Sequence, residues 1–399
     1  MRSLIHRAFP GLLIASLFAA AEVSGQTAAP YAEIDPRAVS YVGPGRDAAH
    51  DLPGTEIKIG LIVPLQGPRE AEGKALQVAA QLAVDDEAAI PFPHHRRLAL
   101  VVRDESGPWG RASSEIVRLV FEDRAVALLT SAEGGTAHLA EQVGNKIGIP
   151  ILTLSSDATT TQINLPWIFR LGPTDAAEAR AFARDIYDQR KLSHIVLVTE
   201  ENHDGRVGGE EFEKAAQHFR ASNPPARVAF STSPSSFETL AGQIAALHPE
   251  ALVLWTGPES AAALMPSLSE TLPAIPIYLC SKAAQSFGEA GPGERCRTCP
   301  ASAATGGVWT VSPAPTASAD REAFERKYRQ RAGVGPSATA AEAYDAVRLL
   351  AAALRESGPN RARLRDALVK QPTFSGVAGP IAFDGAGNNQ AEVKLVPLP

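Results

Sequence analysis

The sequence has little excess charge, few aromatic residues and no long apolar run, and these shortages exclude several kinds of protein. A formal net charge of −6 at pH 7 provides no basic surface for nucleic acid or for an anionic membrane. After the first two dozen residues, no stretch reaches the roughly 18 apolar residues that a membrane-spanning helix needs. Aromatic residues make up only 6% of the chain, whereas there are 32 glycines and 31 prolines. This composition suits an α/β protein with many loops.

Cysteine is also scarce, with three residues in the chain. Cys296 and Cys299 lie in "GERCRTCPAS", and Cys280 lies in "IYLCSK". A haem-attachment motif would need histidine after the second cysteine, where Pro300 stands, and no zinc ligands are clustered nearby. The sequence favours a structural disulfide in a loop with one thiol left over, and a redox-active pair remains the alternative.

Sequence motifs for nucleotide binding are absent from the first strand–turn–helix unit, "IKIGLIVPLQGPREAEGK". A dinucleotide fingerprint needs Gly-x-Gly-x-x-Gly, but Gly67 and Gly73 stand six residues apart and Pro68 lacks an amide donor. A phosphate loop would need Ser or Thr after Lys74, where alanine stands. The turn therefore does not predict a nucleotide enzyme.

Hydrolase motifs are missing as well. The chain has no Gly-x-Ser-x-Gly elbow and no His-Glu-x-x-His pair, and "PHHRR" at His94 and His95 falls in a loop that we expect to be solvated. The sequence therefore predicts a protein without enzyme activity, catalytic residues, cofactor or metal.

The amino terminus has the order of a cleaved signal peptide. Basic residues precede the apolar run "PGLLIASLFAAA", which is too short to span a bilayer, and Val23 and Gly25 are small residues suited to a cut after Gly25. No cysteine follows the run, so no lipid anchor is expected. We expect residues 1–25 to be a signal peptide, residues 26–55 to be an N-terminal arm, and the mature protein to be exported and soluble.

From Ile57 onward, short apolar runs alternate with segments of helical period. The runs are "IKIGLIV", "RLALVVR", "AVALLTS", "PILTLS", "HIVLVTE", "RVAFST", "ALVLWTG" and "IPIYLC". Near-continuous apolar strands separated by helices are typical of parallel sheets covered on both faces. The pattern predicts a doubly wound α/β architecture.

The rhythm changes after "TGGVWTVSP", where three helical segments and two short extended pieces close the chain. A chain that fills one lobe, fills a second and returns to the first connects the lobes several times, as a hinge does. We expect lobe 1 to contain residues 56–172 and 312–374, and lobe 2 to contain residues 173–311 and 375–399.

Several segments together resemble a known family. "IKIGLIVPLQGP", "VVRDESGPWGRASSEIVRLV", "SAEGGTAHLAEQVGNKIGIPILTLSSDAT" and "WIFRLGPTD" are similar to the periplasmic leucine/isoleucine/valine-binding family, the type I solute-binding proteins of ABC importers. The similarity continues more loosely to "GPIAFDGAGN". It implies two α/β lobes joined by three crossovers, with a solute clamped between them and an inner-membrane ABC permease as partner.

The resemblance also indicates where a pocket would lie. In such sheets, ligands bind beyond the carboxyl ends of the strands, where helix N-termini expose amides. The corresponding positions, together with Trp255 at the end of "ALVLWTG", are Glu72, Glu133, Gly134, Gly135, Thr136, Ser155, Ser156, Asp157, Asp204 and Lys282. The alternative for the turns "SAEGGT" and "SSDAT" is plain helix capping.

Most of these positions depart from the family pattern. Lys282 stands near the acid that pairs with a ligand ammonium in the family, so it would repel an ammonium and attract an anion. The acids Glu72, Glu133, Asp157 and Asp204 would favour a cationic group elsewhere. We therefore expect a small polar solute, amino-acid-like or otherwise charged, rather than an aliphatic amino acid in the family's usual pose. The alternatives are a ligand sensor for a membrane receptor and an enzyme that uses the acid cluster.

Overall fold

A computed structural model describes residues 51–108, 110–162, 166–219, 223–231, 234, 236–272, 274–287, 306–313 and 318–398. The expected signal peptide, most of the N-terminal arm, Cys296 and Cys299 lie outside the described residues. Cys280 is a buried free thiol. No described helix is long and apolar enough to cross a membrane.

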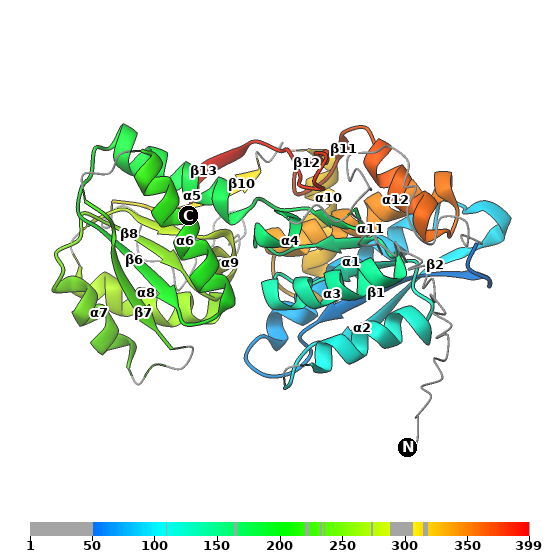
Figure 1. Ribbon diagram of the computed structural model, residues 1–399, viewed down its shortest axis with the longest axis horizontal. Coiled ribbons are helices and arrows are strands. Elements are labelled where there is room, and N and C mark those ends of the chain that lie inside the picture. The colour runs from blue at the N-terminus through cyan, green and yellow to red at the C-terminus, as the bar shows by residue number, and fades with distance from the viewer. Residues whose placement is uncertain are drawn as a thin grey trace, which may run out of the picture. The chain divides into compact units, whose positions relative to one another are not determined.

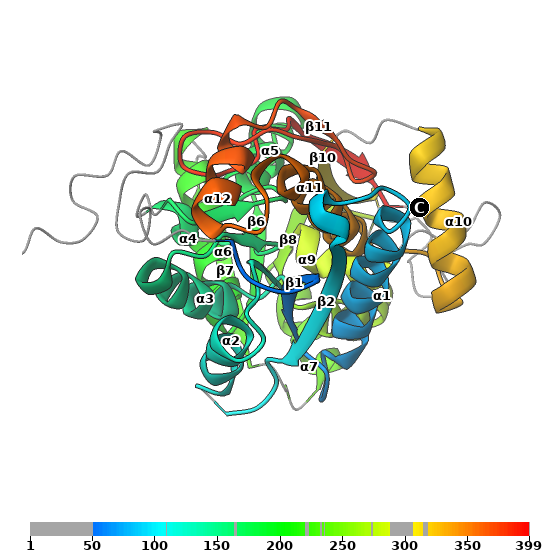
Figure 2. The ribbon, with the colours of Figure 1, turned by 90° about the vertical axis from the view of Figure 1, so that its right-hand side faces the viewer.

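The first sheet is parallel and has the strand order β2-β1-β3-β4-β5. Its strands are β1 (Glu56–Val63), β2 (Arg97–Asp104), β3 (Ala127–Thr130), β4 (Ile151–Thr153) and β5 (Ile168–Arg170). Figure 2 shows α1 (Glu70–Glu87) on one side of this sheet and α2 (Arg111–Phe121) and α3 (Gly134–Ile147) on the other. Because helices cover both faces, β3, β4 and β5 are buried along their whole length.

Three helices late in the chain complete this first lobe. They are α10 (Ala319–Ala332), α11 (Ala338–Ser357) and α12 (Arg361–Lys370), and α11 packs along α1. Each begins at a side chain that accepts a hydrogen bond from the backbone N–H three residues on: Ser318, Ser337 and Asn360. The core of the lobe joins strands near the amino terminus to helices more than 200 residues later.

The second sheet has the order β13-β10-β9-β8-β6-β7 and is parallel except for its edge strand β13. Its strands are β6 (Ile195–Glu200), β7 (Ala226–Phe230), β8 (Ala251–Trp255), β9 (Ile277–Leu279), β10 (Val308–Pro313) and β13 (Val393–Pro397). The helices are α5 (Asp175–Ala183), which continues as a π-helix over Arg184–Gln189, α6 (His203–His218), α7 (Phe237–Ala245), α8 (Pro258–Thr271) and α9 (Ser281–Ala284). Figure 1 shows this second lobe in green to yellow, with β13 in red.

The smaller elements include a 3-10 turn at Pro93–His95, α4 (Thr159–Gln162) and a 3-10 turn at Gln285–Phe287. His94 and His95 are exposed, in keeping with the expected solvated loop. The chain passes between the lobes after β5, after β10 and before β13. This is the predicted architecture of two doubly wound lobes.

The end of the chain is divided between the lobes differently from the expected boundaries. The hairpin of β11 (Phe374–Ser375) and β12 (Pro380–Ile381) contributes Val377 and Ile381 to the first core, whereas the sequence predicts residues 375–399 in lobe 2. Only β13 joins the second sheet, and β10 stays in that sheet through Pro313 rather than leaving it at 312. The apolar character of a short segment predicts that the segment is buried, but it does not predict in which lobe.

Candidate functional site

Charged side chains gather at the strand ends where neighbouring strands are followed by helices on opposite faces of the sheet. In lobe 1, α1 leaves β1 toward one face and α3 leaves β3 toward the other, so the turns after these neighbouring strands diverge. The same divergence occurs in lobe 2 after β6 and β8. Ligands of open α/β sheets bind at such points, beyond the carboxyl ends of the strands.

Arg69, immediately before α1, is the centre of the lobe 1 side. Its guanidinium lies 2.9 Å from the Glu72 carboxylate, 3.1 Å from Glu105 and 2.8 Å from Glu133. Burial raises the pKa of Glu105 to about 7, although Arg69 and the Ser131 hydroxyl oppose this rise. One cation thus holds three carboxylates that come from the ends of three strands.

Lys282 of α9 connects the lobe 2 side to this cluster. Its Nζ lies 3.0 Å from Glu133 Oε2 and also forms an ion pair with Asp204 at the start of α6. Burial alone would raise the pKa of Glu133, but Lys282 and Arg69 lower it to about 2. Burial raises the pKa of Asp204, and the Glu133 carboxylate adds to this rise, although Lys282 opposes it. These contacts join the lobes through buried charges.

The start of α3 closes the same space. The Gly134 amide donates a hydrogen bond of 3.1 Å to Asp204 Oδ1. A Cβ at Gly134 would lie 2.6 Å from Asp204 Oδ1 and 2.9 Å from Asp157 Oδ2. Glycine is therefore required here for the two carboxylates to approach the helix end so closely.

Beside Lys282 there is a small cavity of about 10 Å³, enough for roughly one water molecule. Ser156, Asn202, Asp204, Gly205, Trp255, Thr256, Gly257, Cys280 and Lys282 line it. Trp255 Nε1 donates a hydrogen bond of 3.2 Å to Asp175 Oδ1, and burial raises the pKa of Asp175 to about 7. Around Lys282 the protein's own side chains therefore leave little empty space.

The structure brings together most of the residues expected at the pocket. Glu72, Glu133, Gly134, Asp157, Asp204, Ser156, Trp255 and Lys282 belong to the ion-pair cluster or to the cavity beside it. Three others have different surroundings. A Cβ added at Gly135 would meet no atom within 4 Å, Thr136 is buried, and the Ser155 hydroxyl accepts a hydrogen bond of 3.2 Å from the Asp157 amide. The buried guanidinium of Arg170 donates hydrogen bonds to the backbone carbonyls of Ser155 and Asp157, which fixes the turn after Ser155.

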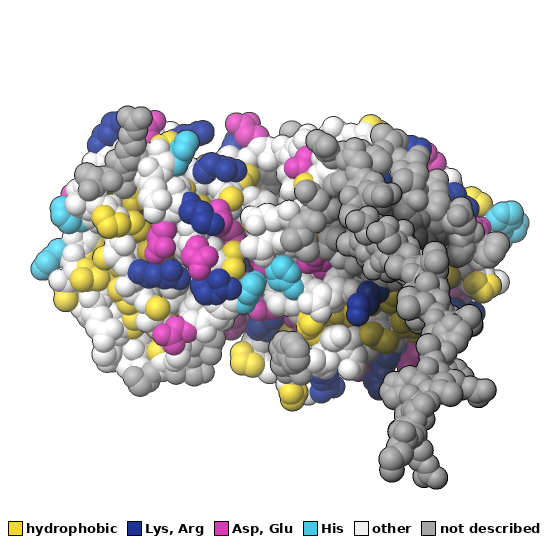
Figure 3. All heavy atoms as spheres, viewed as in Figure 1, with side chains coloured by type: hydrophobic (Ala, Val, Ile, Leu, Met, Phe, Trp, Pro, Cys, Tyr) yellow, Lys and Arg dark blue, Asp and Glu magenta, His cyan; other side chains and the backbone are white. Residues whose placement is uncertain are grey.

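Sequence reasoning missed four ionisable residues at this place: Arg69, Glu105, His138 and His203. Arg69 precedes Glu72 in the turn after β1, and His203 precedes Asp204, so proximity to predicted residues was the available signal. Figure 3 shows acidic, basic and histidine side chains intermingled on one face, without an extended patch of one sign among the atoms coloured there.

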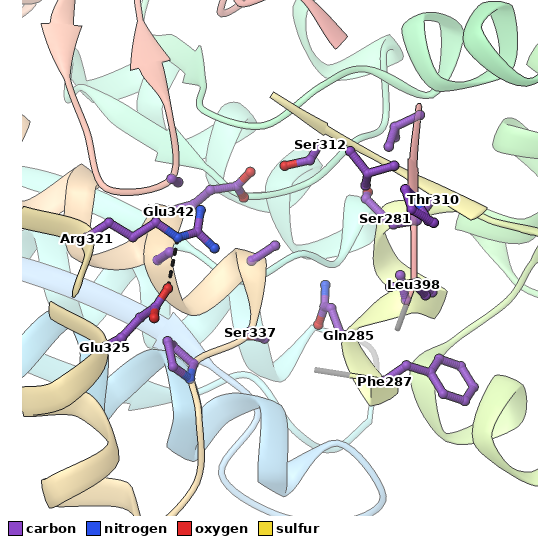
Figure 4. Close-up of a pocket in the computed structure, with 18 of the residues that line it drawn as sticks. Ser281, Gln285, Phe287, Thr310, Ser312, Arg321, Glu325, Ser337, Glu342 and Leu398 are labelled. Atoms are coloured by element: carbon purple, nitrogen blue, oxygen red, sulfur yellow. Dashed lines mark hydrogen bonds and ion pairs between the residues drawn. The ribbon is translucent and has the colours of Figure 1, made fainter. Parts of the chain in front are cut away.

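A second cavity of about 250 Å³ lies on the other flank of α9, where sequence reasoning predicted nothing. Figure 4 shows its lining, with Ser281 and Gln285 from lobe 2 opposite Ser337, Arg321 and Glu342 from lobe 1. Arg321 Nε lies 2.8 Å from Glu325 Oε1. Burial raises the pKa of Glu342 to about 8, with a further contribution from Asp345. Most of the wall is apolar.

Comparison with protein families assigns the chain to one family. The model of a family described as "Periplasmic binding protein" matches residues 56–396, so the chain belongs to that family. It is a family of solute-binding proteins rather than enzymes, in agreement with the prediction of no enzyme activity. No protein with curated annotation matches the chain.

Solved structures of the same architecture are similar to this one. The LivJ substrate-binding protein of Streptococcus pneumoniae, in complex with isoleucine, matches with a TM-score of 0.71 and 22% identity over 86% of this chain and 99% of its own. A solute-binding protein of R. palustris in complex with benzoate matches with a TM-score of 0.74 and 20% identity over 86% and 93%. A Rhodopseudomonas palustris protein with 3,4-dihydroxybenzoic acid matches with a TM-score of 0.71 and 15% identity over 86% and 93%.

Proposed function

We propose that this protein is the exported solute-binding component of an ABC importer and that it binds a small polar solute between its lobes. The observation that carries the proposal is the ion-pair cluster of Arg69, Glu133, Lys282 and Asp204, which joins the two sheets at their switch points. Reversible closure on a solute needs groups from both lobes that gain partners only when the lobes meet. The pair of Lys282 with Glu133 has that property, because its two members come from different lobes.

The charges favour a solute that carries a cationic group. Four carboxylates surround two cations: Glu72, Glu105, Glu133 and Asp204 against Arg69 and Lys282. When the lobes open, Lys282 separates from Glu133, and a solute ammonium could then pair with Glu133 or Asp204. The Lys282 ammonium and the amides at the start of α3 would donate hydrogen bonds to a solute carboxylate. An amino-acid-like zwitterion satisfies both halves of the cleft.

Export and delivery follow from the same proposal. Residues 1–25 would direct secretion to the periplasm and be removed, and the loaded protein would dock on the permease in the inner membrane. Cross-linking in membranes of the native host, followed by mass spectrometry, tests this step. An ABC permease among the products supports it, whereas a receptor or kinase in its place would make the protein a sensor.

The solute class can be tested by a thermal-shift panel of amino acids, amines and aromatic acids. A solute at about 100 times its Kd stabilises the folded protein by about 2.7 kcal/mol. We expect zwitterions or amines to raise Tm and Glu133→Gln to abolish the shift, because the variant loses a carboxylate of the cleft. Glu70→Gln is the matched control, since Glu70 is half exposed and pairs only with Lys74 among the described residues. A shift from benzoate-type anions alone, unaffected by Glu133→Gln, would overturn the assignment.

A further inference from the structure

Two histidines and an aspartate converge next to the ion-pair cluster. His138 comes from α3, Asp157 follows β4, and His203 is the first residue of α6 in lobe 2. The Nε2 atoms of His138 and His203 lie 3.1 Å and 2.7 Å from the same carboxylate oxygen, Asp157 Oδ2. The three ligand atoms all lie within 4.8 Å of one another. The described residues contain no other such group of three.

The surroundings fix which atoms face this point. Asp157 Oδ1 accepts hydrogen bonds of 2.9 Å and 2.6 Å from the amide and hydroxyl of Thr159, which leaves Oδ2 for the imidazoles. On the far side of His138, Nδ1 lies 3.1 Å from Glu141 Oε2. Histidines that bind metals typically donate their second N–H to a carboxylate in this way, which fixes the tautomer and increases ligand basicity.

We propose that His138, Asp157 and His203 form a binding site for a divalent transition-metal ion of the zinc class that bridges the two lobes. Two imidazoles and one carboxylate match the ligand preference of zinc, and a three-ligand site keeps a fourth position open. The Asp157 side chain is only 1% exposed, whereas the side chains of His138 and His203 are 30% and 33% exposed. The buried carboxylate is therefore fixed in place, and an ion can reach the site from solvent on the side of the histidines.

The position gives the ion a role in closure. His138 and Asp157 belong to lobe 1 and His203 to lobe 2, so the complete ligand set exists only when the lobes meet. An ion bound there shifts the population toward the closed form by its differential affinity. Two contacts compete with the ion. Thr159 Oγ1 lies 2.9 Å from His138 Nε2, and Arg206 Nη2 lies 3.5 Å from His203 Nδ1, although this guanidinium has a second partner in Glu210 at 3.3 Å. The site does not depend on which solute the cleft binds.

Isothermal titration of the chelator-treated mature protein with ZnCl₂, without solute, tests the proposal. We expect one ion per chain, with binding weakened at least 10-fold by either His203→Ala or Asp157→Asn, in line with the loss of a ligand. His218→Ala is the matched control because His218 is exposed at the other end of α6. Co²⁺ should give the visible absorption of a four-coordinate site in the wild type and in the control only.

Unchanged zinc affinity in both ligand variants, or binding abolished equally by His218→Ala, would overturn the site. Circular dichroism and thermal melts establish that each variant is folded, so loss of binding cannot be misread as unfolding. Solute titration in the presence of chelator separates the two proposals. Solute binding without zinc binding would contradict only the metal site, and zinc binding without solute binding would contradict only the proposed function.

Discussion

Arg69 and Lys282 each pair with more than one carboxylate, and the balance of these pairs sets the chemistry of the cleft. Glu133 receives both cations and keeps its charge, whereas Asp204 is more buried and has a raised pKa. A buried charge that loses its partner costs far more than the intact pair gains, so opening the lobes exposes groups that need replacement partners. Under the proposed function, a solute with complementary charges would provide them.

Glu342 allows a test of buried charge away from this cleft. Its pKa is about 8 rather than 4.5, so the unfolded chain releases the proton near pH 4.5 while the folded protein retains it to about pH 8. The free energy of unfolding that this group contributes is complete below pH 4.5 and is lost as the pH rises to about 8. We expect Glu342→Gln to match the wild type at low pH and to be more stable, by a few kcal/mol, above pH 8.

Urea denaturation between pH 4 and pH 9 measures this difference. Glu322→Gln on α10 is the control, because the Glu322 side chain is 71% exposed. The free energy of unfolding of this control should change with pH in the same way as that of the wild type. Parallel curves for Glu342→Gln as well would mean that Glu342 is ionised in the folded protein at neutral pH.

At the scale of single elements, helix ends and helix faces determine how closely side chains approach. The start of α3 lies against Asp204 and Asp157 because Gly134 has no side chain, and α6 lies against Trp255 for the same reason at Gly208. Both contacts involve residues far apart in sequence. Each can be tested by adding a single methyl group.

Gly134→Ala should interfere with closure. Its Cβ would lie 2.6 Å from Asp204 Oδ1, so the lobes must stay further apart, and we expect solute affinity to fall at least 10-fold with little change in Tm. The neighbouring Gly135→Ala has open space and should bind normally, which makes it a matched control on the same helix turn. Titration calorimetry with the solute found in the panel compares them, and equal affinities would place the solute elsewhere.

Gly208→Ala should destabilise lobe 2. A Cβ there would lie 1.8 Å from Trp255 Nε1, which displaces the indole and breaks its hydrogen bond to the buried Asp175. We expect a loss of about 1–3 kcal/mol in the free energy of unfolding, typical of overpacking. Gly242→Ala in α7 has no atom within 4 Å of its Cβ and should be neutral or slightly stabilising. Thermal melts followed by tryptophan fluorescence distinguish the two, and equal melting temperatures would contradict this packing.

The sequence predicted the positions of helices and strands better than any other feature of the structure. The apolar runs at β1, β2, β6 and β8 coincide with strands, and the three late helical segments coincide with α10, α11 and α12. Strand β5 was not among the runs, because Arg170 interrupts its apolar sequence. Turns after strands were identified as the place of the cleft because parallel strands bring their carboxyl ends to one edge.

At the scale of the whole molecule, pairing between lobes lay beyond what the sequence could predict. Lys282 and Glu133 are 149 residues apart, and nothing in either segment specifies the other. The same holds for His203 and Asp157, and for the hairpin near Val377 that packs in the first core. Such contacts depend on the hinge geometry, which is set by three crossings of the chain.

Closure itself can be measured by small-angle X-ray scattering. Solute should lower the radius of gyration of the wild type, because contacts such as Lys282 with Glu133 form only when the lobes meet. The doubly neutral variant Lys282→Met with Asp204→Asn should compact less at the same solute concentration. Identical compaction in both proteins would show that the ion pairs do not contribute to closure.

Native mass spectrometry of the protein purified from its own periplasm tests the central claim most directly. The account predicts one small molecule per chain, which leaves on activation with its mass unchanged, rebinds the emptied protein and is not retained by Glu133→Gln. A protein that never holds a small molecule, or that returns an added solute in chemically altered form, would contradict it.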